Sequence, residues 1–195
     1  MSPRRDLLAL LASPGRPWLV AGKGPSFDPA KAAGFRILAL NHACDAVRAN
    51  LAHFIDLEAF EAADPGGPVA LPWRPNLRFR PATLALTPLA ARSLALRAAL
   101  AEGRVYAFNR REAGPPFSPL YPYSSAVYFS AESAFSLLAA AGLTEVYSMG
   151  VDGGTSYAPC FDVKDRLANG QASFDKQTPR LEAICREAGV RWTKV

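Results

Sequence analysis

The sequence predicts an α/β fold in which an open, mostly parallel sheet of about seven strands carries helices on both faces. Short apolar runs alternate with helical patterns along the chain, and several helical segments open with Ser or Thr and close before Gly. Polar residues follow the apolar runs, as at the carboxyl ends of parallel strands. With 195 residues, the chain is expected to form a single domain over 1–195.

The expected strands are short and rich in aliphatic and aromatic residues, and turn residues follow most of them. In chain order they are Trp18–Gly22, Arg36–Leu40, Ala52–Asp56, Pro68–Leu71, Arg104–Phe108, Glu145–Gly150 and Val190–Val195.

The helices are expected where the pattern carries recognisable ends. A Thr-Pro pair starts two of them and a Gly closes each, while a pair of serines starts a third that is rich in small residues. The expected helices are an N-terminal one over 1–15, then Thr87–Gly103, Ser124–Gly142 and Thr178–Gly189. Residues 111–124 are rich in Pro and are expected to form a loop long enough to act as a lid.

Composition excludes several classes of protein. Hydrophobic residues make up 50% and charged residues 20%, which argues against extended disorder. The net charge is +5, but Lys and Arg are scattered rather than clustered, so nucleic-acid binding is not expected. The three cysteines have no metal-binding spacing, and we expect reduced thiols. No apolar run approaches the ~20 residues that cross a bilayer, so we expect a cytoplasmic protein with at most peripheral contact at the inner membrane face.

Candidate functional residues follow the strands, because ligands of parallel sheets bind at the carboxyl ends of the strands. After successive strands the sequence places Gly22, Lys23, Gly24, Pro25 and Ser26; Asn41 and His42; Asp56; Asn109, Arg110 and Arg111; and Asp152 to Tyr157.

The glycine turn after the first strand matches neither common phosphate loop. Pro25 follows Gly24 where a Walker loop has Lys, and Phe27 stands where a dinucleotide fingerprint has its third Gly. The second strand ends in Asn41 rather than in the acid that binds the ribose of NAD. The sequence therefore disfavours NAD and leaves other nucleotides open in a Rossmann-like fold.

Two segments carry a resemblance to a known family. "VAGKGPSFDPAKAAGFRILALNHA" resembles the opening of bacterial sialyltransferases that use CMP-activated donors, and "YSSAVYFSAESAFSLLAAAGLTEVYSMGVDGGTSYAPCFD" resembles their second signature. The motility-associated glycosyltransferase-like proteins of surface-polysaccharide clusters have a similar skeleton. Residues 57 to 120 lie outside the resemblance.

The resemblance implies a role for each matching position. The turn of Gly22, Lys23, Gly24, Pro25 and Ser26 would face the phosphate and ribose, and Asn41 would bind the nucleotide. Ser124 and Ser125 would face the cytidine or the sugar carboxylate from a helix start, Asp152 and Gly153 would shape the pocket, and Tyr157 would donate to the departing phosphate. The chain departs from the family at Lys23, where Asn is common, and in lacking the first of the family's two tyrosines, whose position falls in Gly153-Gly154.

The general base is the largest departure. The family has a His shortly before the last helix, where this sequence offers Asp175, which would need a raised pKa to act as a base. Asp175 could instead cap the last helix. His42 and Asp56 are further candidate bases, whereas His53 lies within a strand and is expected to be a core residue.

The sequence and the resemblance together lead to an expected function. It is transfer of an acidic sugar of the sialic, legionaminic, pseudaminic or Kdo type from a CMP donor to a surface-glycan acceptor. The reaction would be metal-independent and inverting, with the CMP-sugar as co-substrate and no further cofactor, and a homo-oligomer could complete the site. Two alternatives stay open: a magnesium-dependent nucleotide transferase of the pterin pyrophosphokinase kind, and a non-catalytic subunit that binds nucleotide sugars.

Overall fold

The protein folds around one parallel sheet of eight strands. The computed structural model describes residues 6–63, 65–74, 86–90, 93–113, 117–161 and 173–195. The strands lie in the order β6-β5-β4-β3-β2-β1-β7-β8, and every neighbouring pair is parallel. Their bounds are β1 Trp18–Ala21, β2 Arg36–Leu40, β3 Leu51–His53, β4 Val69–Pro72, β5 Val105–Arg110, β6 Tyr123–Ser124, β7 Glu145–Met149 and β8 Arg191–Lys194.

The order of the strands reverses at the middle of the sheet. From β1 the chain adds strands on one side up to β6, and then returns to place β7 and β8 on the other side of β1. Leu19 of β1 is therefore in register with both Ile37 of β2 and Tyr147 of β7. Such a reversal opens a crevice at the carboxyl ends of the strands, where ligands of open parallel sheets bind.

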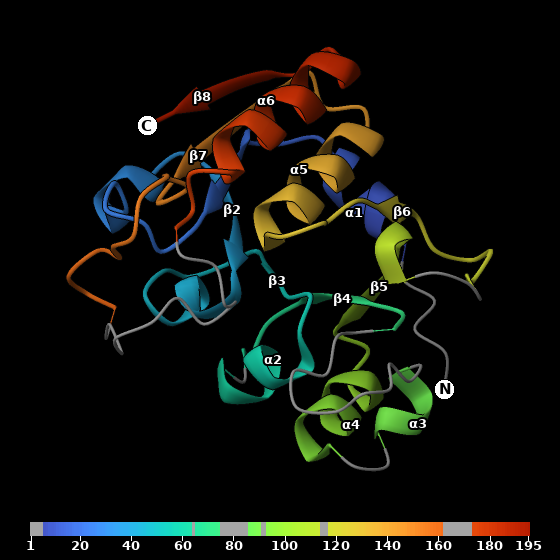
Figure 1. Cartoon of the computed structure of the whole chain (residues 1–195). Helices are drawn as coiled ribbons and strands as arrows, with labels where there is room; N and C mark the ends of the chain where they lie inside the picture. The colour runs from blue at the N-terminus through green and yellow to red at the C-terminus, as the bar shows by residue number, and fades with distance from the viewer. Residues whose placement is uncertain (1–5, 64, 75–85, 91–92, 114–116, 162–172) are drawn as a thin grey trace.

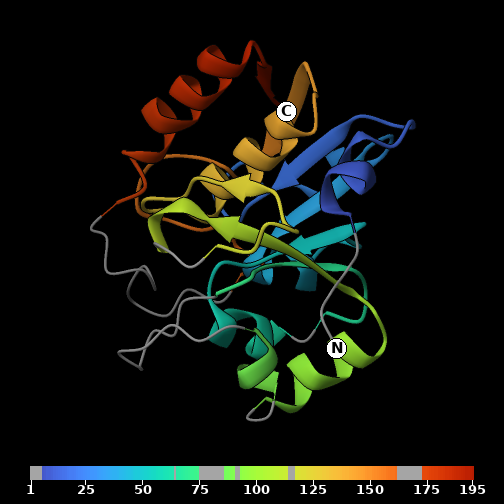
Figure 2. The ribbon, with the colours of Figure 1, turned by 90° about the vertical axis from the view of Figure 1, so that its right-hand side faces the viewer.

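Helices cover both faces of the sheet (Figures 1 and 2). One face carries α1 (Leu7–Ala12), α5 (Ser130–Ala140) and α6 (Gln177–Ala188), which pack in one cluster with residues such as Val20 and Leu38. The opposite face of β3 to β5 carries α2 (Leu57–Ala63), α3 (Leu86–Ala90) and α4 (Leu94–Ala101). The prediction of an α/β sheet covered on both faces is confirmed.

Short 3₁₀ helices complete the second face beside β1 and β2. These are η1 (Pro29–Ala32) and η2 (Asn41–Asp45), and a third, η3 (Arg111–Ala113), follows β5. Leu19 and Ala21 of β1 face the cluster beneath η1 and η2, while Trp18 and Val20 face the opposite cluster. This alternation buries both faces of the strand, which explains why β1 is a continuous apolar run.

All seven expected strands are present, and β6 is the strand that the prediction missed. Its two residues lie in the Pro-rich segment expected to be a loop over 111–124, of which residues 114–116 lie outside the described part. The side chain of Asn109 fixes this segment, since it donates to the carbonyls of Ser118 and Tyr121 and accepts from the Ser118 N–H.

Two of the predicted helices differ in extent from those in the structure. The helix expected from Ser124 begins at Ser130, because Ser124 belongs to β6 and the buried carboxylate of Glu132 accepts the N–H groups of Val127 and Tyr128. That contact satisfies backbone donors just before the first turn of α5. The segment expected as one helix over Thr87–Gly103 contains α3 and α4, since Ser93 caps α4 by accepting from the Leu96 N–H at 3.2 Å.

The last helix also starts one residue earlier than expected. Its N-cap is Lys176, which makes no side-chain cap, and Thr178 lies inside α6. The predicted glycine end was right, because Gly189 adopts a left-handed φ of 68° directly after the helix. In the region expected to be helical over 1–15, α1 follows Asp6, whose carboxylate caps it by accepting from Ala9; residues 1–5 lie outside the described part.

Two further expectations concerned the state of the cysteines and the absence of a membrane-spanning segment. All three cysteines are free, as predicted. Within the described ranges, none of the helices has the length and apolar character needed to cross a membrane.

Candidate functional site

A cavity of about 320 Å³ opens at the carboxyl ends of β1, β2, β3 and β7. It therefore lies where the strand order reverses, as expected for a ligand site in this kind of sheet. Of the residues expected at this edge, eight line the cavity: Gly22, Lys23, Gly24, Asn41, His42, Asp56, Asp152 and Tyr157.

The glycines of the first turn allow two strand ends to meet. A Cβ at Gly22 would lie 2.2 Å from the carbonyl oxygen of Gly150, and one at Gly150 would lie 2.5 Å from the carbonyl oxygen of Gly22. The Gly24 N–H also donates to the Gly150 carbonyl at 2.7 Å. The glycine turn after β1 thus exists in part because the turn after β7 packs directly against it.

Ser26 and Asp152 join the same two turns. The Asp152 carboxylate accepts from both the N–H and the hydroxyl of Ser26 at 2.8 Å, and the Ser26 hydroxyl accepts from the Gly150 N–H at 2.9 Å. Ser26 therefore uses its donors within the protein, and it is not among the described residues that line the cavity. Pro25 beside it is exposed and likewise outside the lining.

Lys23 places a positive charge in the wall of the cavity. Its ammonium nitrogen lies 4.5 Å from the centre of the Tyr157 ring, and both residues line the cavity. The Lys23 carbonyl accepts from the Ala158 N–H at 2.8 Å, so the backbone also links this turn to the segment that carries Tyr157. A cation held over an aromatic face beside a glycine turn suits an anionic ligand.

Asn41 has an unusual backbone for a residue other than glycine. Its φ is 51°, in the left-handed region that Asn tolerates better than most residues. The side-chain amide donates to the Ser130 hydroxyl at 3.2 Å, while Oδ1 is buried without a hydrogen-bond partner among the described residues. An unsatisfied buried acceptor costs about 1–3 kcal/mol, and together with the backbone strain it is a feature typical of functional positions.

His42 is oriented by a neighbouring carboxylate. Its Nδ1 lies 3.2 Å from Asp45 within η2, and the half-buried ring lines the cavity. A carboxylate at one ring nitrogen fixes the orientation of the imidazole and leaves the other nitrogen to act on a ligand. Such a nitrogen can accept a proton from a bound ligand.

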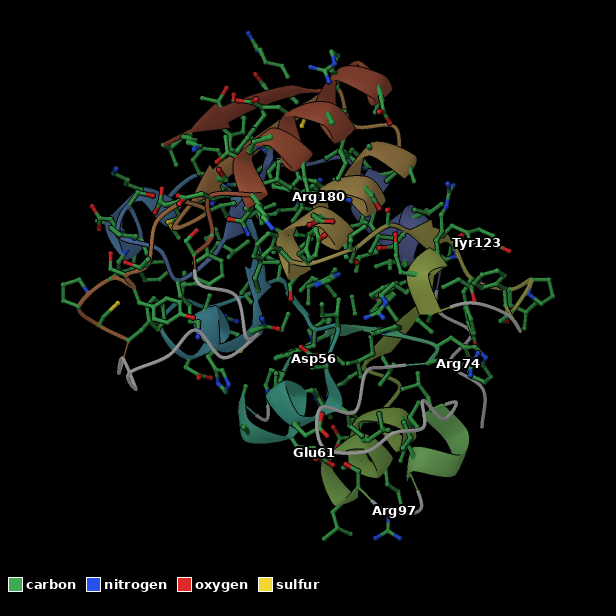
Figure 3. The ribbon with its side chains drawn as sticks, viewed as in Figure 1. Asp56, Glu61, Arg74, Arg97, Tyr123 and Arg180 are labelled. Carbon is green, nitrogen blue, oxygen red and sulfur yellow. The ribbon has the colours of Figure 1, made fainter. Side chains whose placement is uncertain are left out.

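Asp56 lies at the start of α2, between α2 and α5 in the view of Figure 3, and lines the cavity. Burial lowers the pKa of the Arg110 guanidinium at the end of β5, whereas the nearby carboxylates of Glu112 and Asp56 act to raise it. Asp56 therefore has an electrostatic partner in Arg110, which is half-buried.

His53 is a core residue, as expected. It is fully buried, its Nε2 lies 2.9 Å from the Ser133 hydroxyl, and its ring stacks on Phe108 at 5.2 Å between centres. Burial lowers the pKa of its imidazole to about 3, so the ring is neutral at physiological pH.

Ser124 and Ser125 lie outside the described lining of the cavity and not at a helix start. Ser124 is buried with its hydroxyl against that of Ser133. The Ser125 hydroxyl donates to Glu112 at 2.6 Å and its N–H donates to Ser136. Both serines therefore fix the junction between β6 and α5.

Asp175 differs from the expected base in position and in acidity. Its exposed carboxylate accepts from the Gly154 N–H and the Ser173 hydroxyl, each at 2.8 Å, and these bonds, the one from Gly154 foremost, lower its pKa. A general base needs the opposite shift. Asp175 does not cap α6 either, because Lys176 is the N-cap. It holds the loop of Gly153 and Gly154, and a Cβ at Gly153 would lie 2.9 Å from its Oδ1.

The cavity has further wall residues that the sequence did not single out. They include Glu58 on α2 and four residues from later parts of the chain, which are Tyr128, Phe129, Phe174 and Gln177. The aromatic segment before α5 carries no capping signal in the sequence; the buried carboxylate of Glu132 positions it by accepting the N–H groups of Val127 and Tyr128. Glu132 also pairs with Arg180 of α6 at 3.1 Å, and Arg180 is labelled in Figure 3.

Comparison with known proteins gives no relatives: no family model matches the sequence, and no curated protein or solved structure matches the chain. Among the described residues, no group of three or more His, Cys, Asp or Glu side chains is placed to hold a metal ion.

Proposed function

We propose that this protein is a glycosyltransferase that moves an acidic sugar from a CMP donor to a surface-glycan acceptor. The observation that carries the proposal is the cavity at the reversal of strand order, where a glycine turn with Lys23 faces a strand end with Asn41. Its volume of about 320 Å³ lies at the lower end of the range of small-molecule sites. A nucleoside monophosphate is a ligand of suitable size.

Different residues of the cavity would bind different parts of the donor. Lys23 and the backbone of the glycine turn would meet the donor phosphate, since a positive point charge and close backbone approach both favour an anion. Asn41 would bind the nucleoside. The Tyr157 hydroxyl would donate to the phosphate as it leaves, beside the Lys23 ammonium.

His42 is our preferred general base. It lines the cavity, and Asp45 orients its ring, whereas Asp175 is exposed and has a lowered pKa. In the transfer step, neutral His42 takes the proton of the acceptor hydroxyl as that oxygen attacks the anomeric carbon. The bond between that carbon and the phosphate oxygen breaks, and CMP leaves with the electron pair. A single displacement inverts the configuration of the sugar.

Asp56 and Glu58 favour a second candidate. Carboxylate oxygens are ligands that magnesium prefers, and Asp56 after β3 and Glu58 on α2 both line the cavity, so a magnesium-dependent nucleotide transferase is the alternative. The two functions differ in their requirement for the metal and in the phosphate chain of the nucleotide.

Thermal unfolding with a panel of CMP, CDP, UDP, GDP, ATP and NAD, each with and without magnesium, tests the proposal. A ligand that binds only the native state raises the melting temperature. We expect CMP to raise it equally with and without magnesium, and Lys23→Ala to weaken CMP binding about tenfold while the exposed control Lys31→Ala leaves it unchanged. A shift that requires both magnesium and a nucleoside triphosphate would support the alternative, and a panel without any shift would refute both.

A further inference from the structure

Two buried acceptor oxygens in the cavity wall lack a hydrogen-bond donor in the part of the chain that the structure describes. They are Oδ1 of Asn41 and Oε2 of Glu58, and both residues line the cavity. A buried acceptor without a donor is unfavourable, so native proteins pair nearly all such atoms. Two of them in one cavity wall indicate that a ligand supplies the missing donors.

The two oxygens come from adjacent elements. Asn41 opens η2 and Glu58 lies in the first turn of α2, and η2 and α2 pack against each other. Asp56, directly before α2, adds a third acceptor group to this side of the cavity. We call Asn41, Asp56 and Glu58 the acceptor end of the cavity. Lys23 and Tyr157, on the segments after β1 and β7, carry donor groups elsewhere in the cavity wall.

The groups around Glu58 restrict which functional groups of a ligand can bind there. Asp56 interacts with Arg110, and the Asn41 amide donates to Ser130, but no described residue donates to Glu58 Oε2. A keto oxygen placed here would face further acceptors and be repelled, and a hydroxyl brings only one hydrogen. A nitrogen that carries two or more hydrogens can serve both unpaired oxygens.

We propose that the acceptor end binds an amino group of the substrate and that Glu58 determines this specificity. The inference rests on the proposed function for the identity of its ligands, and the amino group could come from two sources. One is the exocyclic amine of the nucleobase, because in nucleotide-binding sheets the nucleoside extends from the glycine turn toward the second strand. The other is the amine of an amino sugar in the acceptor, since Asn41 adjoins the proposed base His42.

Dissociation constants for two matched pairs of probes distinguish these sources. CMP and UMP differ at the exocyclic amine, and glucosamine and glucose differ at the amine of the sugar. We expect the wild-type protein to bind the amino member of at least one pair about tenfold more tightly or better, because its partner leaves the acceptors unpaired. Glu58→Gln should reduce that preference to about threefold or less, because an amide can present either an oxygen or an N–H.

Glu61→Gln is the matched control, since Glu61 lies on the same helix but is exposed, and it is labelled in Figure 3. The Glu61→Gln variant should keep the full preference for the amino member of the pair. In the absence of ligand, the melting temperature of every variant should lie within a few degrees of the wild-type value. Equal binding within both pairs, or a preference that survives Glu58→Gln, would overturn the inference. Binding of CMP and UMP with equal affinity would leave the proposed function standing, whereas a glucosamine preference without nucleotide binding would support the acceptor end and refute the proposed function.

Discussion

At the scale of the residue, the structure places two candidate bases differently: His42 lines the cavity, whereas Asp175 is exposed and is not among the described lining residues. The sequence could identify both as candidates, because His42 follows an expected strand and Asp175 lies shortly before the expected last helix, where the resembling family has its base. It could not show that Asp45 lies beside His42 or that Gly154 donates to Asp175, since hydrogen bonds between loops depend on the fold. The resemblance places the base in the segment before the last helix, whereas the candidate base that lines the cavity, His42, lies in η2.

Replacing His42 tests the proposed base. We expect His42→Gln to lower turnover with the natural donor and acceptor by about a hundredfold or more, because the acceptor hydroxyl loses its proton acceptor. CMP affinity should change little, since the phosphate meets Lys23. Steady-state kinetics and calorimetry would measure the two effects separately. Asp175→Asn is the comparison, and a large loss of turnover there with none in His42→Gln would return the role of base to Asp175.

The lowered pKa of Asp175 predicts how stability depends on pH. A carboxyl whose pKa is lower in the folded state stabilises the fold above its unfolded value, and that contribution disappears as the pH falls through the folded value. At pH 7 the wild-type protein should therefore melt above Asp175→Asn. Melting temperatures measured from pH 7 to pH 3 should converge below about pH 4. A difference that is constant over this range would show that the charge of Asp175 is irrelevant to stability.

At the scale of the element, predictions succeeded where the local pattern decides the structure and failed where a distant contact does. The apolar runs of β1 and β2 are buried on both faces, so their composition alone marks them as strands. The two residues of β6 have no such signal, and their pairing with β5 depends on Asn109 fixing the preceding loop. Likewise, the start of α5 depends on Glu132 and not on the serines before it.

The meeting of the turns after β1 and β7 gives a prediction for glycine. Gly22→Ala should destabilise the protein by about 1–3 kcal/mol or more, because its Cβ would lie 2.2 Å from a backbone oxygen that cannot rotate away. Chemical denaturation would measure the loss, and nucleotide binding should weaken with it. Gly66→Ala is the control, since a Cβ there meets no atom within 4 Å. Equal stability of the two variants would contradict the close packing of the turns.

At the scale of the whole molecule, the sequence predicted the class of sheet but not the order of its strands. The alternation of strands and helices indicates parallel pairing, yet it is compatible with several orders. The prediction that polar residues after the strands share one edge depends only on parallel pairing, and eight of those residues line the cavity. Glu58 and the aromatic residues of the wall could not be predicted in this way. They lie on helices and loops, and the order of the strands decides which helices and loops reach this edge of the sheet.

The pairing of β1 with β7 also bears on how the protein is made. The first turn of the cavity is completed near residue 24, but Gly150 and Asp152, which hold it in place, follow more than a hundred residues later on the chain. During synthesis, the amino-terminal strands leave the ribosome well before their partner does. A nascent chain that stops short of Asp152 therefore has no formed site, and ligand capture by ribosome-bound chains would report the moment at which β7 reaches the sheet.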